Sequence, residues 1–412
     1  MSAIDPALGS PDLAALCPRT LSALPHASRL VLAMLDELQG GALAVLLPEG
    51  RWLRVGQGAL VAQLRVHDHA LFARVLAQGD IGLAESWMDG LWETDALPGL
   101  LIHLASNRAH LEKAMHGRVL SLLGHRLWHR LRANTRAGAR RNIEAHYDLG
   151  NDFYALWLDD SMTYSSAVFE SPDDSLEQAQ QRKYRRILDR IGARPGQHIL
   201  EIGCGWGGFA QIAATEYGCR VRGVTLSPAQ LAHACARAER GGFDDRVDLR
   251  LCDYRDIDGQ YDHIVSIEMI EAVGEQYWPT YFAQLSARLR PGGHCMVQAI
   301  TISDALFERY RRGTDFIQRH VFPGGMLPAP SVVQQQARQA GLAVVEDYRF
   351  GQDYTGTLAG WLQRFEGVLP QVRALGYPER FIRLWRFYLA YCEAGFRADS
   401  LDVHHYLLSH AD

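Results

Sequence analysis

Hydrophobic and polar positions change their spacing several times along the 412-residue chain. From "GALAVLLPEGRWLRVG" onward, apolar runs on either side of a turn at Pro48–Gly50 predict two short β-strands. A third strand is expected over residues 60–66, where apolar and polar residues alternate. The segment "HALFARVLAQGDIGLAESWMDGLW" then predicts two helices broken at Gly79. Together these elements predict a small N-terminal α+β domain over residues 1–117.

The pattern becomes regular after residue 180. Apolar, strand-length runs alternate with helical segments, and the runs are "QHILEIG", "CRVRGVTL", "RVDLRLC", "YDHIVSI" and "GGHCMVQAI". Such alternation implies a mostly parallel sheet with helices on both faces. Residues 358–409 are predicted to be mostly helical and are rich in aromatic side chains. We therefore expect a doubly wound, Rossmann-like α/β domain over residues 142–412, with helical additions at its C-terminal end.

The stretch between these two domains, residues 118–141, has a different composition. It carries seven arginines and no acidic residue, with leucines and a tryptophan among them. A basic amphipathic segment of this kind suits contact with an anionic membrane surface. A solvated helix that merely connects the two domains explains the same pattern equally well, so this segment alone leaves both interpretations open.

Composition and charge narrow the class of protein. Hydrophobic residues make up 48% and charged residues 22% of the chain, which is ordinary for a globular protein. The formal net charge of −5 gives no nucleic-acid signature. Seven scattered cysteines without a Cys-x-x-Cys pair favour a reducing cytoplasm over a disulfide framework or a metal site. The N-terminal sequence lacks the features of a signal peptide, and no run is long enough to predict a membrane-spanning helix.

The chemistry begins in "HILEIGCGWGGFA", where a predicted strand runs into several glycines. Gly203, Gly205 and Gly208 have the G-x-G-x-x-G spacing of a dinucleotide loop, which alone is a weak signal. A nicotinamide enzyme needs an acid at the end of the second strand, and residues 224–226 contain none. Glu201, just before the first glycine, would also repel a pyrophosphate.

An acid at position 201 suits a ligand that carries an ammonium group. S-adenosylmethionine has an ammonium group, a carboxylate and a cationic sulfonium. Glycines, including Gly207, let the backbone approach such a ligand, and the amides at a helix N-terminus favour its carboxylate. Asp253, after the third predicted strand, is placed to accept a hydrogen bond from the adenine amino group. The alternative for Glu201 is an ordinary acid at a strand end.

Several further motifs, in order along the chain, resemble one family. They are "HYDLGNDFYALWL", "MTYSSAVF", "LEIGCGWGG", "GVTLSPAQ", "DYRD", "EAVG", "HVFPGGMLP" and "FYLAYCEAGFRA". The chain is similar in these motifs to the cyclopropane-fatty-acyl-phospholipid synthases and the related mycolic-acid methyltransferases. The resemblance covers roughly residues 40–400 and includes the small N-terminal domain. It implies a class I fold that transfers the methyl group of S-adenosylmethionine to the double bond of an unsaturated acyl chain.

The resemblance also implies which residues bind the cofactor. These are Tyr164, Ser165, Glu201, Gly203, Gly205, Gly207, Thr225, Leu226, Gln230, Asp253 and Tyr254. The segment "TLSPAQ" has a second interpretation as a helix start, with Ser227 as the N-cap and Pro228 in the first helical position. Both interpretations of this segment can hold together.

The family uses a bound bicarbonate as its base, held by a Cys, a Glu, a His and a Tyr. The resemblance matches the Glu to Glu271 and the Tyr to Tyr354, but Ser166 stands at the Cys position and Gln298 at the His position. Serine and glutamine still donate hydrogen bonds, yet they remove a thiol and a proton-sharing imidazole. Bicarbonate binding is therefore left open.

Other residues near these motifs have alternative roles. Glu271 could itself act as a base if burial raised its pKa. The neighbouring Glu268 and Glu275 are expected to be ordinary surface acids. Cys392 matches a cysteine to which the family assigns a catalytic role, although a structural, buried cysteine explains it as well. No metal is expected.

The leading hypothesis is a methyltransferase that acts on phospholipid acyl chains at the inner face of the membrane and forms a cyclopropane ring. The first alternative is a methyl- or methylene-branched product, because the cation formed by methyl transfer can lose its proton elsewhere. Methylation of a soluble small molecule and a non-catalytic cofactor sensor are further alternatives. A homodimer is compatible with the sequence, which does not determine the oligomeric state.

Overall fold

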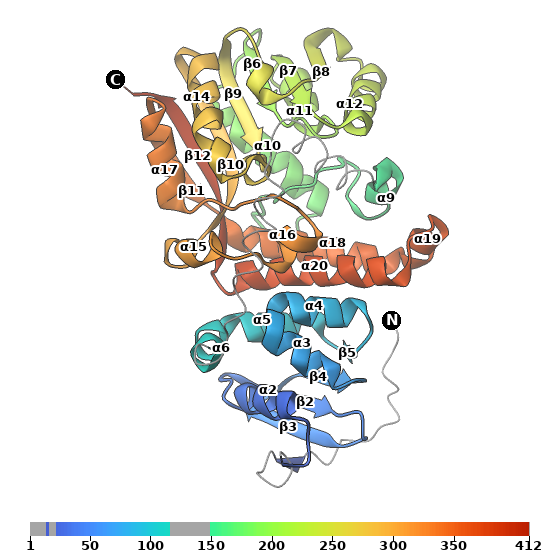
Figure 1. Ribbon diagram of the computed structural model, residues 1–412. Helices are drawn as coiled ribbons and strands as arrows, with labels where there is room; N and C mark the ends of the chain where they lie inside the picture. The colour runs from blue at the N-terminus through green and yellow to red at the C-terminus, as the bar shows by residue number, and fades with distance from the viewer. Residues whose placement is uncertain (1–13, 16–21, 116–148, 412) are drawn as a thin grey trace.

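Two β-sheets organise the chain in the computed structural model, which describes residues 14–15, 22–115 and 149–411. The smaller N-terminal sheet lies at the bottom of Figure 1 and the larger sheet at the top. The long helices α18 (Gly351–Gly367) and α20 (Glu379–Arg397) run across the molecule between them. The basic stretch 118–141 lies outside the described residues.

The N-terminal unit packs helices against a mixed sheet with the order β1-β3-β2-β4-β5 among the described strands. Its strands are β1 (Ala14–Ala15), β2 (Gly41–Leu46), β3 (Trp52–Gln57), β4 (Leu60–Val66) and β5 (Trp92–Thr94). Its helices are α2 (His26–Asp36), α3 (Ala70–Gln78), α4 (Asp80–Met88), α5 (Leu97–Ser106) and α6 (Arg108–Met115). The predicted antiparallel strand pair, the third strand and the helix break at Gly79 are all confirmed.

The larger sheet has the order β11-β12-β10-β9-β6-β7-β8 among the described strands. Its strands are β6 (His198–Ile202), β7 (Arg220–Thr225), β8 (Val247–Leu251), β9 (Tyr261–Ile267), β10 (Leu289–Ile302), β11 (Leu342–Arg349) and β12 (Leu401–His410). Strands β6 to β10 pair in parallel. The predicted doubly wound α/β fold with a mostly parallel sheet is therefore confirmed.

Helices of the larger unit cover the sheet and extend beyond it (Figure 1). The α-helices not yet named are α9 (Gly150–Trp157), α10 (Leu176–Ile191), α11 (Gly208–Thr215), α12 (Pro228–Gly241), α13 (Ile270–Val273), α14 (Trp278–Arg288), α15 (Asp304–Tyr310), α16 (Phe316–His320), α17 (Pro330–Gln339) and α19 (Leu369–Ala374). Short 3₁₀ turns are η1 (Asp244–Arg246), η2 (Tyr254–Asp256) and η3 (Glu275–Tyr277). Helix α12 begins as predicted, because the Ser227 hydroxyl accepts from the Gln230 amide. None of the described helices is long and apolar enough to cross a membrane.

The last part of the chain differs from the helical prediction for residues 358–409. Strand β12 inserts between β10 and β11 and runs antiparallel to both. Residues 403–408 of β12 are buried without alternation, because the strand is covered on both faces. Its sequence, "LDVHHYLLSH", contains three histidines that conceal this burial pattern.

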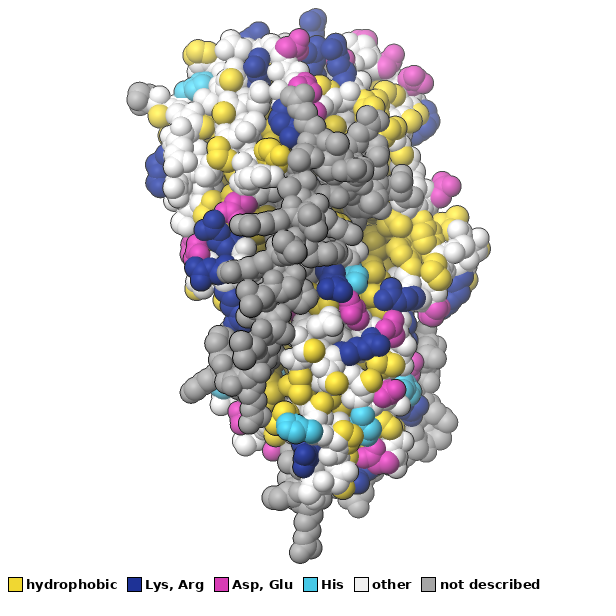
Figure 2. Space-filling view, viewed as in Figure 1, with side chains coloured by type: hydrophobic (Ala, Val, Ile, Leu, Met, Phe, Trp, Pro, Cys, Tyr) yellow, Lys and Arg dark blue, Asp and Glu magenta, His cyan; other side chains and the backbone are white. Residues whose placement is uncertain are grey.

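The two units meet where α20 packs on α4 and α5, and Arg383 is the central contact. Its guanidinium donates to the backbone oxygens of Trp87, at 2.6 Å, and Trp92, at 3.1 Å. The same group lies 4.5 Å from the centroid of the Trp87 ring, whose Nε1 donates back to the Arg383 oxygen. Basic and acidic side chains lie side by side on the visible face in Figure 2. Arg380 on α20 forms an ion pair with Asp89, just after α4.

We expect Arg383→Ala to lower the free energy of unfolding by about 2 kcal/mol or more, because it removes two hydrogen bonds to backbone oxygens at the junction and a cation–π contact. Arg380→Ala is the control, since Arg380 is 56% exposed and forms only a surface ion pair, which contributes about 1 kcal/mol at most. Urea unfolding followed by tryptophan fluorescence measures both. Equal losses in the two variants would contradict a junction held by Arg383.

Candidate functional site

The glycine loop follows β6 and leads directly into α11. The amides of Gly203 and Cys204 both donate to the Val224 oxygen at the end of β7, which anchors the loop between the two strands. Gly203, Gly205 and Gly207 have φ angles of +88°, +51° and +84°, a backbone conformation that other residues rarely adopt. These glycines are therefore required by the turn itself, which leaves the N-terminus of α11 open to a ligand.

Glu201 is a buried carboxyl group beside this loop. The carboxyl is 3% exposed, and its Oε2 atom has no hydrogen-bond partner among the described residues. Burial raises the pKa of Glu201 well above its usual value. A buried carboxyl oxygen without a donor costs free energy unless a ligand supplies one. The ammonium group of S-adenosylmethionine is such a donor, so the residues present fit the predicted cofactor.

The predicted residues Tyr164 and Ser165 lie on the segment before α10. The Tyr164 hydroxyl is 2.7 Å from that of Tyr388 on α20. The Ser165 hydroxyl accepts from the Lys183 ammonium at 2.5 Å. Ser165 is thus held by a cation, which makes its hydroxyl hydrogen available to an acceptor such as a carboxylate.

Beyond β7, the Thr225 hydroxyl donates to the Gln230 side chain at 2.9 Å, and Leu226 follows at the strand end, where it is half-buried. These residues begin α12, and their role in cofactor binding stays a prediction. Asp253, predicted to accept from adenine, already forms hydrogen bonds within the chain. The Arg255 guanidinium donates to both of its carboxylate oxygens, at 2.8 and 2.6 Å. An adenine amino group would have to share these oxygens with Arg255. The neighbouring Tyr254 hydroxyl is buried and has no partner among the described residues.

The prediction that Glu268 is a surface acid is wrong. Its side chain lines an internal pocket and accepts three hydrogen bonds. The Ser166 amide and the Gln298 side-chain amide donate to Oε1 at 2.8 and 2.7 Å. The Tyr354 hydroxyl donates to Oε2 at 2.8 Å. Three of the residues assigned to anion binding therefore converge on a carboxylate that belongs to the chain itself. Glu275 is a surface acid as expected and pairs with Arg311.

Glu271 lies in the same pocket but in a different electrostatic environment. Its Oε1 atom accepts from the Ile300 amide at 2.5 Å, whereas Oε2 has no partner among the described residues. Burial, together with the nearby Glu268 charge, raises the pKa of Glu271 to about 8. Glu271 is therefore mostly protonated at neutral pH.

The pocket connects this centre to the N-terminal unit. It encloses about 1340 Å³ and is lined at one end by Tyr164, Glu268, Glu271 and Tyr354. Its other end is lined mainly by apolar side chains, among them Leu43, Leu64, Leu71, Phe72, Leu101 and Leu104. The volume exceeds the 300–1,000 Å³ that is usual for small-ligand sites. The lining is mostly apolar, and its charged side chains include Asp80, Arg108 and Asp315 at the junction of the two units as well as Glu268 and Glu271.

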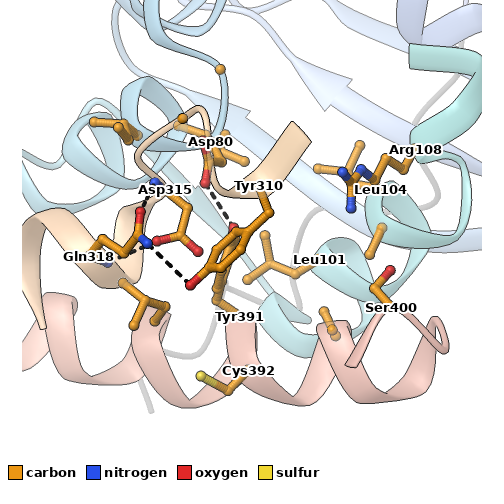
Figure 3. Close-up of a pocket in the computed structure, with 18 of the residues that line it drawn as sticks. Asp80, Leu101, Leu104, Arg108, Tyr310, Asp315, Gln318, Tyr391, Cys392 and Ser400 are labelled. Carbon is orange, nitrogen blue, oxygen red and sulfur yellow. Dashed lines mark hydrogen bonds between the residues drawn. The ribbon is translucent and has the colours of Figure 1, made fainter. Parts of the chain in front are cut away.

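Figure 3 shows the pocket wall at the junction of the two units. Asp80 accepts from the Tyr391 hydroxyl at 2.8 Å, and Asp315 caps α16 by accepting from the Gln318 amide at 2.8 Å. Burial and the nearby Asp80 raise the pKa of Asp315 to about 7. Cys392 lies on α20 along the same wall, and burial raises the pKa of its thiol. A neutral thiol is a poor nucleophile, which favours a structural role for Cys392.

The sequence analysis missed Lys183 and misjudged Glu268, although the sequence contains a weak indication of the position of each. Lys183 occupies the apolar stripe of α10 between Ala179 and Ile187, where a fully buried lysine is unexpected. Glu268 directly follows the buried run "YDHIVSI", which places it at the ligand-binding edge of a parallel sheet. No group of three or more His, Cys, Asp or Glu side chains in the described part of the chain is arranged to hold a metal ion.

Comparison with known proteins gives consistent matches. A sequence model described as mycolic acid cyclopropane synthetase matches residues 134–406. Tuberculostearic acid methyltransferase of Mycobacterium tuberculosis is 42% identical over 349 residues, which are 82% of this chain and 81% of the relative. Cyclopropane-fatty-acyl-phospholipid synthase of Escherichia coli is 36% identical over 379 residues, 87% of this chain and 94% of the relative.

Solved structures agree with these matches. A mycolic acid cyclopropane synthase complexed with SAH and CTAB is 30% identical with a TM-score of 0.62, covering 65% of this chain and 97% of that one. Coclaurine N-methyltransferase, at 20% identity and the same TM-score of 0.62, shows the shared fold alone.

We expect Glu201→Gln to weaken binding of S-adenosylmethionine by roughly 10- to 100-fold, because a charge-assisted hydrogen bond to the ammonium group is lost. Isothermal titration calorimetry measures this without turnover. Glu216→Gln, which breaks a surface pair with Arg185, is the control and should leave affinity unchanged. Wild-type affinity in Glu201→Gln would exclude Glu201 from the cofactor site.

Proposed function

Because the chain belongs to the mycolic acid cyclopropane synthetase family, we propose that it transfers a one-carbon unit to the double bond of an unsaturated fatty acyl chain. It is a methyltransferase whose methyl donor is S-adenosylmethionine. The observation that carries the substrate proposal is the pocket of about 1340 Å³, whose lining is mostly apolar and also includes Tyr164, Glu268 and Glu271. A soluble, polar substrate would leave most of this lining without complementary groups.

The chain's own residues define what happens at the charged end of the pocket. Bound S-adenosylmethionine supplies an electrophilic methyl group, held through Glu201, the glycine loop and Ser165. The apolar lining excludes water, so a weakly nucleophilic alkene is the group held closest to the methyl donor. Addition of the methyl group leaves a positive charge on the acyl chain. Tyr164, Tyr354, Glu268 and Glu271 all line this pocket, and aromatic rings and carboxyl groups are the side chains that stabilise such a charge.

We propose membrane phospholipids as the carriers of the acyl chain, with the enzyme peripheral to the inner membrane face. The relative named cyclopropane-fatty-acyl-phospholipid synthase supports this choice, since its similarity extends over 87% of the chain. The basic stretch 118–141 is the predicted contact with anionic headgroups. A homodimer stays a prediction.

The product we propose is a cyclopropane ring, formed when the proton leaves the newly added methyl group. A branched chain is the alternative. Proton loss from a neighbouring acyl carbon gives a methyl-branched alkene, whereas a hydride shift followed by proton loss from the added methyl group gives a methylene branch. The relative at 42% identity, which is named a methyltransferase rather than a cyclopropane synthase, keeps this alternative open.

Expression of the chain in a bacterium rich in monounsaturated phospholipids should yield acyl chains heavier by one CH₂ group. Mass spectrometry of the fatty acid methyl esters detects the added carbon, and fragmentation separates a ring from a branch. The empty vector is the control. Unchanged lipids in cells that contain folded, cofactor-binding protein would overturn the proposal.

We further expect Leu104→Trp to reduce turnover of vesicle lipid several-fold, because the larger ring fills the apolar end of the pocket, and to leave affinity for S-adenosylmethionine unchanged. Leu375→Trp is the matched control, since Leu375 is 46% exposed and outside the pocket. Radiolabelled methyl transfer and calorimetry measure the two quantities. Full activity in Leu104→Trp would place the acyl chain elsewhere.

A further inference from the structure

We propose that the Glu268 carboxylate is the general base of the reaction and occupies the position that a bound anion would otherwise take. The inference rests on the proposed function, because it assigns the group that removes the proton after methyl transfer. It makes this enzyme independent of any dissociable base.

Three hydrogen-bond donors converge on Glu268. The donors are the Ser166 amide, the Gln298 side-chain amide and the Tyr354 hydroxyl, at 2.8, 2.7 and 2.8 Å. Ser166 and Gln298 are fully buried and Tyr354 is 6% exposed, so these donors are closed to bulk water. The Ser166 hydroxyl points away and donates to the Ala167 oxygen at 3.1 Å. With Glu268 in place, a small anion would find these three donors already used.

The orientation of the Gln298 amide is set by a chain of contacts that ends at Glu268. Arg186 lies 2.9 Å from Nδ1 of His405 and can only donate, so Nδ1 is the acceptor. The ring proton therefore sits on Nε2, which donates to the Gln298 oxygen at 2.8 Å. This leaves the amide nitrogen of Gln298 facing the Glu268 carboxylate. A neutral glutamine held in this way donates to the base without competing for its proton.

Charge around the pocket favours ionised Glu268 over ionised Glu271. Burial raises the pKa of Glu268, but attraction to the fully buried Lys183, whose own pKa burial lowers to about 7, and the three donors oppose the rise. Glu271 has a single backbone donor and is further raised by the Glu268 charge. Glu268 and Glu271 therefore carry one negative charge between them, and this charge lies on Glu268. Glu268 is then the group able to take up a proton.

The backbone at Glu268 shows that the side chain is held in place against a conformational cost. Its φ angle is +47°, in the left-handed region that favours glycine. A glutamate here is retained by the contacts of its side chain. Replacement by glycine relieves the backbone and opens a space lined by the three donors, so the Glu268→Gly fold should persist.

The chemical step balances with Glu268 as the only acceptor. The alkene electron pair forms the new carbon–carbon bond as the sulfonium–methyl bond breaks, which leaves a carbocation. A C–H bond of that cation then breaks, and its proton passes to a Glu268 oxygen. The released electron pair closes the cyclopropane ring or forms a new double bond. Glu268 ends as a carboxylic acid, and loss of its proton to solvent restores the base.

The test compares four proteins in buffer freed of carbon dioxide, with vesicles of monounsaturated phospholipid as substrate. The wild type should keep its rate when bicarbonate is removed. Glu268→Gln, which keeps shape and hydrogen bonding but cannot accept the proton, should lose about 100-fold or more. Glu268→Gly should lose as much and recover a measurable part with added bicarbonate or formate. Glu275→Gln, a change to a surface acid, should leave the rate unchanged.

Three results would overturn the proposal: a wild-type rate that falls without bicarbonate, an active Glu268→Gln, or an anion-independent Glu268→Gly. A second arm does not need turnover. Carbon-13 NMR of labelled bicarbonate should show binding to Glu268→Gly and none to the wild type, and binding to the wild type would also refute it. If no protein methylates any lipid while this binding contrast holds, the substrate proposal fails and the assignment of Glu268 to the anion position stands.

Discussion

A carboxylate removed from bulk water must be surrounded by hydrogen-bond donors and a positive charge. Glu268 is such a carboxylate, at the centre of the molecule. Its three donors come from the segment before α10, from β10 and from α18. Lys183 adds the opposite charge from α10. Four separate parts of the chain therefore meet around one side chain.

The pocket around Glu268 also depends on the N-terminal unit. Neither unit encloses the cavity alone, because the apolar lining comes largely from the smaller unit and the charged end from the larger one. The junction formed by α20 with α4 and α5 therefore does more than join two domains. It fixes the apolar lining from the smaller unit relative to Glu268 and Glu271 in the larger unit.

Much of this architecture was predictable from the sequence, for identifiable reasons. The parallel strands β6 to β10 are apolar runs of the right length, and the glycines before α11 have a spacing that only a tight turn requires. Strand β12 was missed because its histidines are buried by pairing with β10 and β11, which no local pattern reveals. Glu201 could be assigned to the cofactor loop because an adjacent motif explains it.

Glu268 could not be assigned in the same way. In "SIEMIEAVG" two glutamates lie three residues apart, and resemblance selects Glu271. What distinguishes Glu268 is a left-handed backbone angle and donors that are distant in sequence, from Ser166 to Tyr354. The departures at Ser166 and Gln298 were visible, but their meaning depends on Glu268, which accepts a hydrogen bond from both residues.

The insertion of β12 between β10 and β11 has a consequence for biosynthesis. Residues 401–410 leave the ribosome after both of their neighbours, so the edge of β10 that carries Gln298 stays unpaired while the nascent chain grows. Until His405 arrives, the Gln298 oxygen lacks the hydrogen bond that orients the amide toward Glu268. The reaction centre is therefore completed late in translation. A nascent chain that lacks β12 also lacks the contact that orients the Gln298 amide beside Glu268, even when it already binds the methyl donor.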